Sequence, residues 1–304
     1  MTNADFQAVS VHAPTAPALP LVCDSPHSGE QYPADFGAAA SLAQLRQGED
    51  THVDALWSAA PALGATLVAA HFPRVYIDPN RTLRDLDPEL LAEPWPEPLD
   101  PGEKTRLGKG LIWRRMDKAT PIYDRKLSLA EVRHRIQAYY EPYHAALAQA
   151  IESAQRDFGA VWHLNLHSMP NDAYERLGRE SAHPLADFVL GDRDGTTCEP
   201  EFIALIETAL RDRGYTVARN DPYKGVQLIA QIGQPALNRH SLQVEIRRPL
   251  YMDEATRERN AGFESLRADL SQVLAQVAQY ARAHVGDIVD KIDARASSRS
   301  RGPG

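Results

Sequence analysis

The chain has 304 residues, with 33 Lys and Arg against 41 Asp and Glu, and therefore a formal net charge of −8. This length can bury a full core, and the negative charge excludes a general binder of nucleic acid or of an anionic membrane surface. The two cysteines, Cys23 and Cys198, are too few for a disulfide framework and form no CxxC pair. Any bound metal would therefore need histidine and carboxylate ligands.

The two ends of the chain differ in character from the residues between them. Residues 1–18 have no basic start and no long apolar run, so they predict a flexible lead and not a signal peptide. Residues 290–304 are small and polar and predict a disordered tail. We therefore expect one domain at 19–289 in a cytoplasmic protein without a membrane-spanning segment. The residue pattern does not predict which oligomeric state the protein adopts.

Strand-like and helix-like patterns alternate along this domain. In chain order the sequence predicts a strand at 19–23, a helix at 42–60, strands at 66–71 and 74–77, a surface loop at 85–109, a long helix at 128–158, strands at 160–166 and 188–190, a helix at 199–213, strands at 215–218, 228–230 and 242–246, and a helix at 254–283. This alternation predicts an α/β fold, a single domain with a central mixed β-sheet flanked by helices.

Two histidines follow predicted strands within short polar motifs. His27 lies in the motif DSPHSG, and His167 lies in NLHSMP. In sheets of this kind, polar residues just beyond the strand ends gather into the active site. Because no GxSxG elbow and no HExxH motif is present, two histidines from separate strands suit a metal site better than a catalytic triad. Taken alone, His27 fits a solvent-exposed loop equally well.

A third metal ligand should be a carboxylate, and three candidates lie nearby. Glu30 forms a His-x-x-Glu spacing with His27, which zinc carboxypeptidases also use, and Glu49 and Asp50 lie in GEDTHVDALW. An acid such as Asp50 near the start of a helix also has an ordinary role in stabilising the helix dipole. The residues themselves leave the choice among the three open.

Two further motifs supply charged groups beside the sheet. Asn80 and Arg81 follow a predicted strand in DPNR, where they can present several donors to one carboxylate, although a turn with a surface arginine is an equal alternative. Glu245 lies within an apolar strand, where a buried carboxylate needs a function or a partner, such as Arg247 or Arg248.

Together these groups describe a recognisable chemistry. Zinc in an open site polarises a carbonyl and lowers the pKa of its water, and a separate glutamate can move the proton from water to the leaving nitrogen. The expected reaction is hydrolysis of an amide whose substrate carries a carboxylate.

At this point the sequence resembles a known family. Its motifs, in order, are DSPHSGEQYP, GEDTHVDALW, FPRVYIDPNR, RKLSLAEVRHRIQAYYEPYHAAL, LNLHSMP and LQVEIRRPLYMDE. They are similar to those of the N-formylglutamate amidohydrolases (N-formylglutamate deformylases) over residues 19–280. The family resembles zinc carboxypeptidases and aspartoacylases in fold. The resemblance implies release of formate from N-formyl-L-glutamate in histidine catabolism, a small anionic N-acyl amino acid as the partner, and Zn²⁺ or another divalent transition metal as the cofactor.

The resemblance also assigns roles to individual positions. It implies that His27, His167 and Asp50 bind the metal, with Asp50 favoured over Glu30 and Glu49, and that Glu245 is the general base. It further implies substrate binding by Asn80, Arg81 and Arg74, with Ser168 beside the metal ligands.

One segment departs from the family pattern. Where the family has a Thr-Arg pair, this chain has Ile229-Ala230, within the altered segment 226–232. Loss of an arginine that holds a second substrate carboxylate would favour a different N-acyl amino acid. A zinc carboxypeptidase-like peptide hydrolase and a non-catalytic binding protein are the alternatives on the same scaffold.

Overall fold

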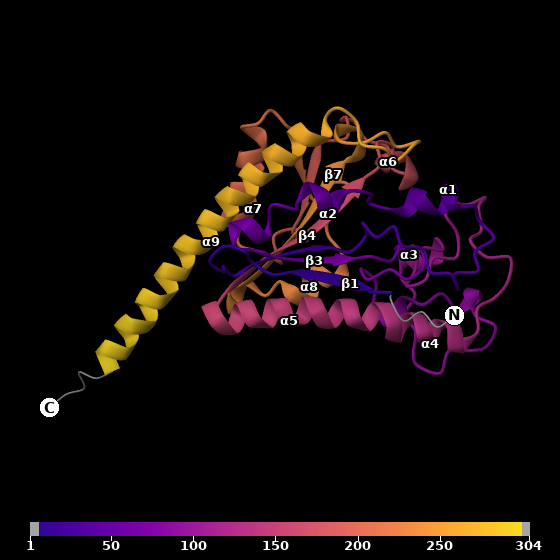
Figure 1. Ribbon diagram of the computed structural model, residues 1–304, viewed down its shortest axis with the longest axis horizontal. Helices are drawn as coiled ribbons and strands as arrows, with labels where there is room; N and C mark the ends of the chain where they lie inside the picture. Colours follow the sequence, from indigo (N-terminus) through magenta and orange to yellow (C-terminus); the bar gives the residue numbers. More distant parts are fainter. Residues whose placement is uncertain (1–5, 300–304) are drawn as a thin grey trace.

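The computed structural model describes residues 6–299, with side chains to residue 285. Its centre is a mixed seven-stranded sheet in the order β1-β3-β2-β4-β7-β5-β6, covered by helices on both faces (Figure 1). The strands are β1 (Val9–His12), β2 (Leu21–Ser25), β3 (Thr66–Ala70), β4 (Val161–Met169), β5 (Phe188–Gly191), β6 (Val217–Arg219) and β7 (Arg239–Arg247). The predicted single-domain α/β fold is confirmed.

The middle of the sheet is parallel. β3, β2, β4 and β7 run in one direction, whereas β1 pairs antiparallel with β3, and β5 pairs antiparallel with β7. All nine residues of β4 are buried, because helices cover both sides of this central strand. The carboxyl ends of β2, β4 and β7 therefore meet at the same edge of the sheet.

The helices form two layers, one on each face. The α-helices are α1 (Leu42–Leu45), α2 (Val53–Leu56), α3 (Glu103–Arg106), α4 (Leu129–Arg135), α5 (Glu141–Phe158), α6 (Ala173–Arg176), α7 (Pro200–Arg211), α8 (Gln227–Ile232) and α9 (Phe263–Arg299). Helices α2, α7 and α9 pack on one face, and α4, α5 and α8 pack on the other (Figure 1). None of the helices between residues 6 and 299 has both the length and the apolar character needed to cross a membrane.

The long helix predicted at 128–158 has a local interruption. Ser128 and Glu131 form a reciprocal capping box that begins α4, and Gly159 ends α5 in a left-handed conformation. A π-helical turn, Ile136–Tyr140, separates α4 from α5 just before Pro142. Proline has no backbone N–H for the regular helical ladder, which explains the irregularity at this point.

The structure differs from the prediction at both ends of the chain. Residues 9–12, expected within a flexible lead, form β1, whose residues pair with the otherwise open edge of β3. Helix α9 continues to Arg299, through most of the tail that was expected to be disordered. Residues 1–5 and 300–304 of these two predicted segments lie outside the described residues.

Several internal elements were also predicted wrongly. The helix expected at 42–60 is broken between α1 and α2, where His52 has a φ of 68°. Residues 74–77 form a turn, and 228–230 lie in α8, because a short apolar run does not distinguish a strand from a buried helix. Residues 254–262 are turns, since Asp253 Oδ1 accepts the N–H groups of Ala255 and Thr256, and α9 begins only at Phe263.

Candidate active site

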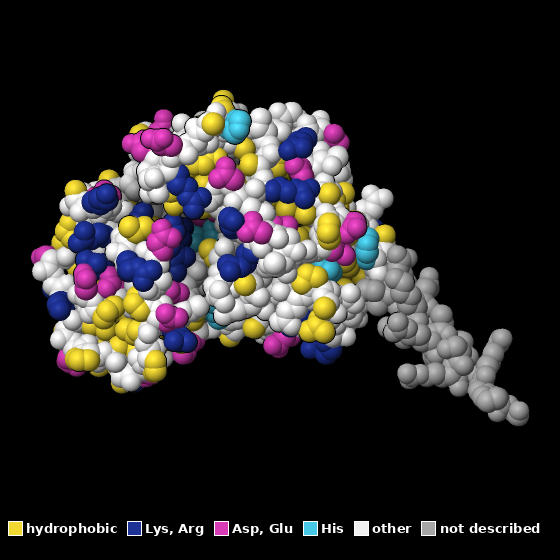
Figure 2. Space-filling view, turned by 180° about the vertical axis from the view of Figure 1, so that it is seen from behind, with side chains coloured by type: hydrophobic (Ala, Val, Ile, Leu, Met, Phe, Trp, Pro, Cys, Tyr) yellow, Lys and Arg dark blue, Asp and Glu magenta, His cyan; other side chains and the backbone are white. Residues whose placement is uncertain are grey.

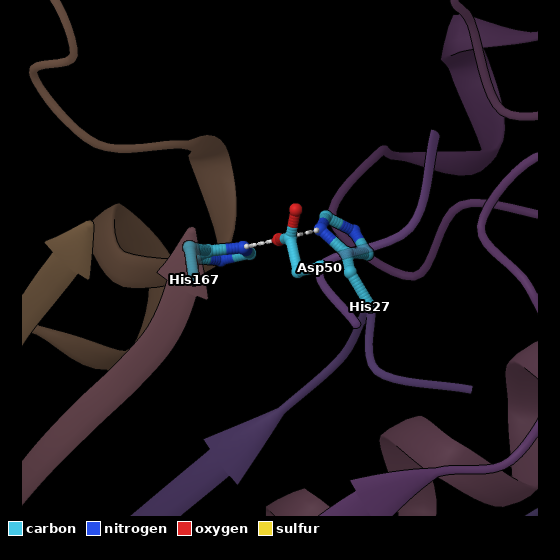
Figure 3. A group of neighbouring side chains, drawn as sticks. All are labelled: His27, Asp50 and His167. Carbon is cyan, nitrogen blue, oxygen red and sulfur yellow. Dashed lines mark hydrogen bonds and ion pairs between the residues drawn. The ribbon is translucent and has the colours of Figure 1, made fainter. Parts of the chain in front are cut away.

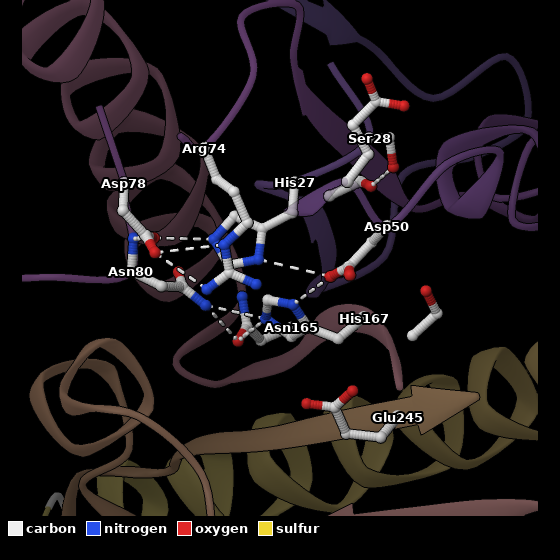
Figure 4. Close-up of polar contacts among 12 residues, drawn as sticks. His27, Ser28, Asp50, Arg74, Asp78, Asn80, Asn165, His167 and Glu245 are labelled. Carbon is white, nitrogen blue, oxygen red and sulfur yellow. Dashed lines mark hydrogen bonds and ion pairs between the residues drawn. The ribbon is translucent and has the colours of Figure 1, made fainter. Parts of the chain in front are cut away.

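The candidate site lies at the carboxyl ends of the parallel strands. His27 follows β2 by two residues, His167 lies near the end of β4, and Glu245 lies near the end of β7 (Figure 4). The register of β4 and β7 pairs His167 directly with Glu245. A side chain on Gly29 would meet the Phe72 carbonyl oxygen at 2.3 Å, so only glycine allows the loop after His27 to pass this closely.

His27, Asp50 and His167 form one buried group. Their potential ligand atoms all lie within 4.8 Å of one another, which makes the group a candidate metal site. Asp50 Oδ2 lies 3.3 Å from His27 Nδ1 and 3.0 Å from His167 Nδ1, between the two imidazoles (Figure 3). The three residues are 1%, 1% and 3% exposed. Two imidazoles and one carboxylate are a common ligand set for zinc and similar divalent metals.

The far nitrogen of each imidazole is already bound. His27 Nε2 donates to Asp78 Oδ1 at 2.8 Å, since the ionised Asp78 carboxylate can only accept. Burial alone would raise the pKa of Asp78, but Arg74, Arg81 and His27 hold it well below its ordinary value. The other ring nitrogen of His27, Nδ1, is thereby directed at Asp50.

A chain of hydrogen bonds orients His167 in the same way. Asn165 Nδ2 donates to Asp24 Oδ1 at 2.8 Å, so Asn165 Oδ1 accepts from His167 Nε2 at 2.7 Å. Asp24 also accepts from His163 Nε2 at 2.8 Å and from Tyr143 Oη. This buried network orients the His167 ring so that Nδ1 faces Asp50.

Asp50 is held from its other side by Arg248. Arg248 Nη2 donates to Asp50 Oδ1 at 3.0 Å, and Arg248 Nε donates to Ser168 Oγ at 3.2 Å. Burial opposes ionisation of Asp50, but the hydrogen bonds from His167 and His27 and the charge of Arg248 place its pKa well below the ordinary value. The Ser168 hydroxyl therefore contacts Arg248, and no hydrogen bond joins it to either histidine.

The two alternative acids face other partners. Glu30 pairs with Arg46 at 2.9 Å on the surface, and Glu49 accepts from Tyr32 Oη at 2.7 Å and from Thr51 Oγ1 at 2.9 Å. Neither belongs to the group formed by the two histidines. Of the three acids considered from the sequence, the structure brings only Asp50 to them.

Glu245 lies beside this group, and among the described side chains it has no cationic partner of its own. Its Oε1 accepts from Gln243 Nε2 at 2.8 Å, whereas Arg247 pairs with Asp187 and Arg248 pairs with Asp50. The alternative that Glu245 is a salt-bridged structural residue is therefore wrong. Burial first, and then the nearby Asp50 charge, raise the pKa of Glu245. A raised pKa suits a carboxylate that accepts and returns a proton.

The three residues expected to bind substrate surround Asp78. Arg74 Nη2 donates to Asp78 Oδ2 at 2.8 Å, and Arg81 Nη2 lies 3.8 Å from the same oxygen. Among the described residues, Arg74 Nη1 and Arg81 Nη2 make no hydrogen bond. Asn80 Nδ2 instead lies 2.8 Å from His167 Nε2 and 3.2 Å from Asn165 Oδ1, so it shares the Asn165 acceptor with His167. The geometry thus favours the two arginines over Asn80 for a carboxylate.

A cavity of about 840 Å³ opens onto the site. Its lining includes the metal-binding candidates, Glu245, and residues of the 102–109 segment and of 223–227. On the molecular surface, Lys and Arg side chains gather around a hollow in which a histidine is visible (Figure 2). The site is therefore locally cationic although the whole chain is acidic.

Four residues of the site were not predicted as such from the sequence. Asp78 and Asn165 were noted only as parts of polar motifs, Arg248 only as a partner for Glu245, and Trp113 not at all. Trp113 Nε1 donates to Asp78 Oδ2 at 3.2 Å. Asn165 lies in β4 and Arg248 directly follows β7, so their position near a strand end was a local signal. Asp78 and Trp113 lie in loops and meet only through tertiary contacts.

The fold and this site define an α/β protein with a buried His-Asp-His group at the carboxyl edge of its sheet. The family model described as N-formylglutamate amidohydrolase matches residues 19–252, and the chain belongs to this family. An N-formylglutamate deformylase of Pseudomonas aeruginosa is 29% identical over 85% of this chain and 90% of its own length, and one of Pseudomonas putida is 27% identical over 78% and 83%.

Solved structures agree with this assignment. The crystal structure of an N-formylglutamate amidohydrolase from Ralstonia eutropha JMP134 has a TM-score of 0.91 and 67% identity, covering 92% of this chain and 100% of that one. A protein of Agrobacterium tumefaciens at 20% identity shares the fold, with a TM-score of 0.62 over 94% of this chain and 97% of its own.

Proposed function

We propose that this protein hydrolyses the amide bond of N-formyl-L-glutamate to formate and glutamate. The observation that carries the proposal is the placement of Glu245 next to His167 in the strand register, beside the buried group of His27, Asp50 and His167. The relatives named N-formylglutamate deformylase and amidohydrolase support the choice of substrate.

The donor set fits a divalent transition metal, for which zinc is the proposed ion. His27 and His167 would each offer Nδ1, since their Nε2 atoms are bound to Asp78 and Asn165, and Asp50 would offer Oδ2. When bound, such a metal polarises a carbonyl group and makes water more acidic.

The remaining chemistry belongs to side chains of this chain. Glu245 accepts the proton of the attacking water at its carboxylate and donates it to the nitrogen of the leaving glutamate. Arg74 and Arg81 bind the α-carboxylate through their free Nη atoms, and Asn80 holds Asn165 and His167 in place. The C–N bond breaks and the formyl carbon gains one water oxygen, so formate and the free amine leave.

The experiment is a turnover assay on metal-loaded protein with N-formyl, N-acetyl and N-succinyl amino acids and short peptides, read by release of the free amine. We expect formate and glutamate from N-formyl-L-glutamate, and loss of turnover after chelation. Release of C-terminal residues from peptides without deformylation would instead support a carboxypeptidase-like enzyme. Tight substrate binding with no turnover would support a binding protein. For its cellular role, we still predict that the protein is a cytoplasmic enzyme of histidine catabolism.

A further inference from the structure

Two half-buried lysines line the cavity without an acidic partner among the described side chains. Lys104 lies in α3, and Lys109 follows it at the end of the 85–109 loop. Both side chains are half-buried, and among the described side chains no carboxylate oxygen lies within 4.0 Å of either Nζ. By contrast, Arg74 pairs with Asp78, Arg176 pairs with Asp172, and Arg248 pairs with Asp50.

The surroundings of these lysines are mostly cationic. Burial first, and then the charges of Arg74, Lys104 and Arg176, lower the pKa of Lys109 to about 8. The pKa of Lys104 is also lowered, by burial and then by Arg81. Cations crowded together with little compensating charge repel one another, and a bound anion relieves this repulsion.

Trp113 links Lys109 to the metal-binding candidates. Lys109 Nζ lies 5.2 Å from the centre of the Trp113 ring, and Arg74 Cζ lies 5.0 Å from the same ring. The indole N–H donates to Asp78, which in turn accepts from His27. Lys109 therefore lies one indole ring away from the carboxylate that orients His27. A substrate bound between these groups would reach the arginines and the lysines together.

The backbone that carries the lysines is fixed in place. The N–H of Lys109 donates to the Lys104 carbonyl at 2.8 Å, and Arg81 Nε donates to the Lys109 carbonyl at 3.1 Å. A side chain on the adjacent Gly110 would meet the Asp85 carbonyl oxygen at 2.3 Å, and Thr105 Oγ1 donates to that oxygen. The two ammonium groups are thus presented by an ordered segment, which reduces the entropic cost of binding.

The segment that departs from the family pattern does not offer a competing cation. Ile229 is fully buried, and neither Ile229 nor Ala230 lines the cavity. On that side the lining consists of Tyr223, Gly225, Val226 and Gln227. The half-buried, unpaired positive charge available to a second carboxylate therefore comes from the 102–109 segment, whereas Lys118 of the lining is exposed.

We propose that Lys104 and Lys109 bind the side-chain carboxylate of the substrate, while Arg74 and Arg81 bind its α-carboxylate. This inference rests on the proposed function and deepens it, since it makes the two lysines the residues that select N-formyl amino acids with an acidic side chain. N-formyl-L-glutamine, which differs only by a neutral side-chain amide, is then a poor substrate.

The test compares N-formyl-L-glutamate with N-formyl-L-glutamine on the metal-loaded wild type, on Lys104→Met/Lys109→Met, and on Lys126→Met. Lys126 is an exposed lysine that does not line this cavity, so its variant controls for loss of charge. In the double variant we expect KM for N-formyl-L-glutamate to rise about 10- to 100-fold with kcat nearly unchanged. KM for N-formyl-L-glutamine should stay the same. Lys104→Arg/Lys109→Arg should keep the preference for the acid.

A second measurement separates this proposal from the proposed function. Calorimetric titration with glutarate, a dicarboxylate with the carbon spacing of glutamate, should show at least about tenfold weaker binding to the double methionine variant. If the wild type uses N-formyl-L-glutamine as well as N-formyl-L-glutamate, the lysine site is overturned and deformylation stands. If no N-formyl compound is hydrolysed, the proposed deformylation is wrong. If the double methionine variant then binds glutarate as tightly as the wild type, the lysine site is overturned as well.

Discussion

At the scale of single residues, Glu245 is unlike the other buried acids of the site. Asp50 and Asp78 each have an arginine partner, whereas Glu245 accepts only from Gln243 among the side chains that the structure describes. Its raised pKa follows from burial and from the nearby negative charge of Asp50. An acid in this environment changes its protonation state more readily than a salt-bridged one, which is what a general base requires.

Replacement of this carboxylate tests that role directly. We expect Glu245→Gln to lower kcat about 10²- to 10⁴-fold, since the amide keeps the size and loses the ability to accept a proton. Zinc content, measured by elemental analysis, should remain that of the wild type. Glu152→Gln on the exposed side of α5 removes the same charge outside the site and should leave kcat unchanged. Full activity in a folded Glu245→Gln protein would remove Glu245 from the mechanism.

Lys109 gives the site a pH dependence on the alkaline side. Its pKa of about 8 means that the ammonium is present below this pH and is lost as the pH rises through it. Because kcat/KM reports the free enzyme, kcat/KM for N-formyl-L-glutamate should fall above about pH 8. The charged groups that set this value are Arg74, Lys104, Arg176 and Asp117.

Lys109→Arg is the matched variant for this prediction. Arginine keeps its charge at every pH used in such an assay, so the alkaline fall in kcat/KM should shift upward or disappear. The measurement is a pH profile of kcat/KM from pH 6 to about pH 10 for both proteins. Identical profiles would assign the alkaline limb to another group.

At the scale of elements, β4 and β7 do more than form the core. Asn165 and His167 project from the same side of β4 and contact each other, and Ser241 and Glu245 lie opposite β4 residues on β7. Asp24 at the end of β2 binds both His163 and Asn165. The pairing of β2 with β4 therefore lets the buried Asp24 carboxylate orient His167 through Asn165.

Asn165→Ala should expose the contribution of this network. Without the Asn165 carbonyl oxygen, His167 Nε2 loses its acceptor and the imidazole is less firmly oriented, so zinc affinity should fall about 10- to 100-fold. The affinity is measured by competition with a chromophoric chelator. Ser271→Ala is the control, because it removes a hydroxyl of α9 that donates to the Arg267 carbonyl at 2.7 Å and lies outside this network. Equal zinc affinities for the two variants would contradict the positioning role.

Short elements also mark the limit of prediction from sequence. The histidines and Glu245 were predictable because each lies at or near the end of an apolar strand, where a polar residue is conspicuous. The break at Glu49–His52 was not, since it depends on contacts such as the Asp50 N–H donating to the His27 carbonyl at 3.0 Å. The orientation of His167 was equally hidden, because Asp24 and Asn165 meet only when β2 pairs with β4.

At the scale of the whole molecule, α9 belongs to the main core. Leu270, Val273, Leu274 and Val277 are buried in the same cluster as α2, α7 and the sheet. Leu274→Ala should therefore lower the free energy of unfolding by about 2–5 kcal/mol, measured by denaturant titration. Leu237→Ala, at a position that is 58% exposed, should change it by less than about 0.5 kcal/mol. Similar unfolding midpoints for both variants would mean that α9 adds little to the core.

Metal binding should also be visible in the stability of the whole chain. His27, Asp50 and His167 come from the segment after β2, the segment before α2 and the end of β4, so one ion would join three distant parts of the fold. A ligand at 100 times its Kd adds about 2.7 kcal/mol to the free energy of unfolding, provided that it binds only the folded state. The temperature of thermal unfolding should therefore rise with zinc and return after chelation.

His27→Ala should abolish this rise, whereas Glu245→Gln should retain it, because Glu245 acts on the substrate and does not belong to the metal-binding group. A zinc-dependent shift that persists in His27→Ala would place the metal elsewhere in the chain.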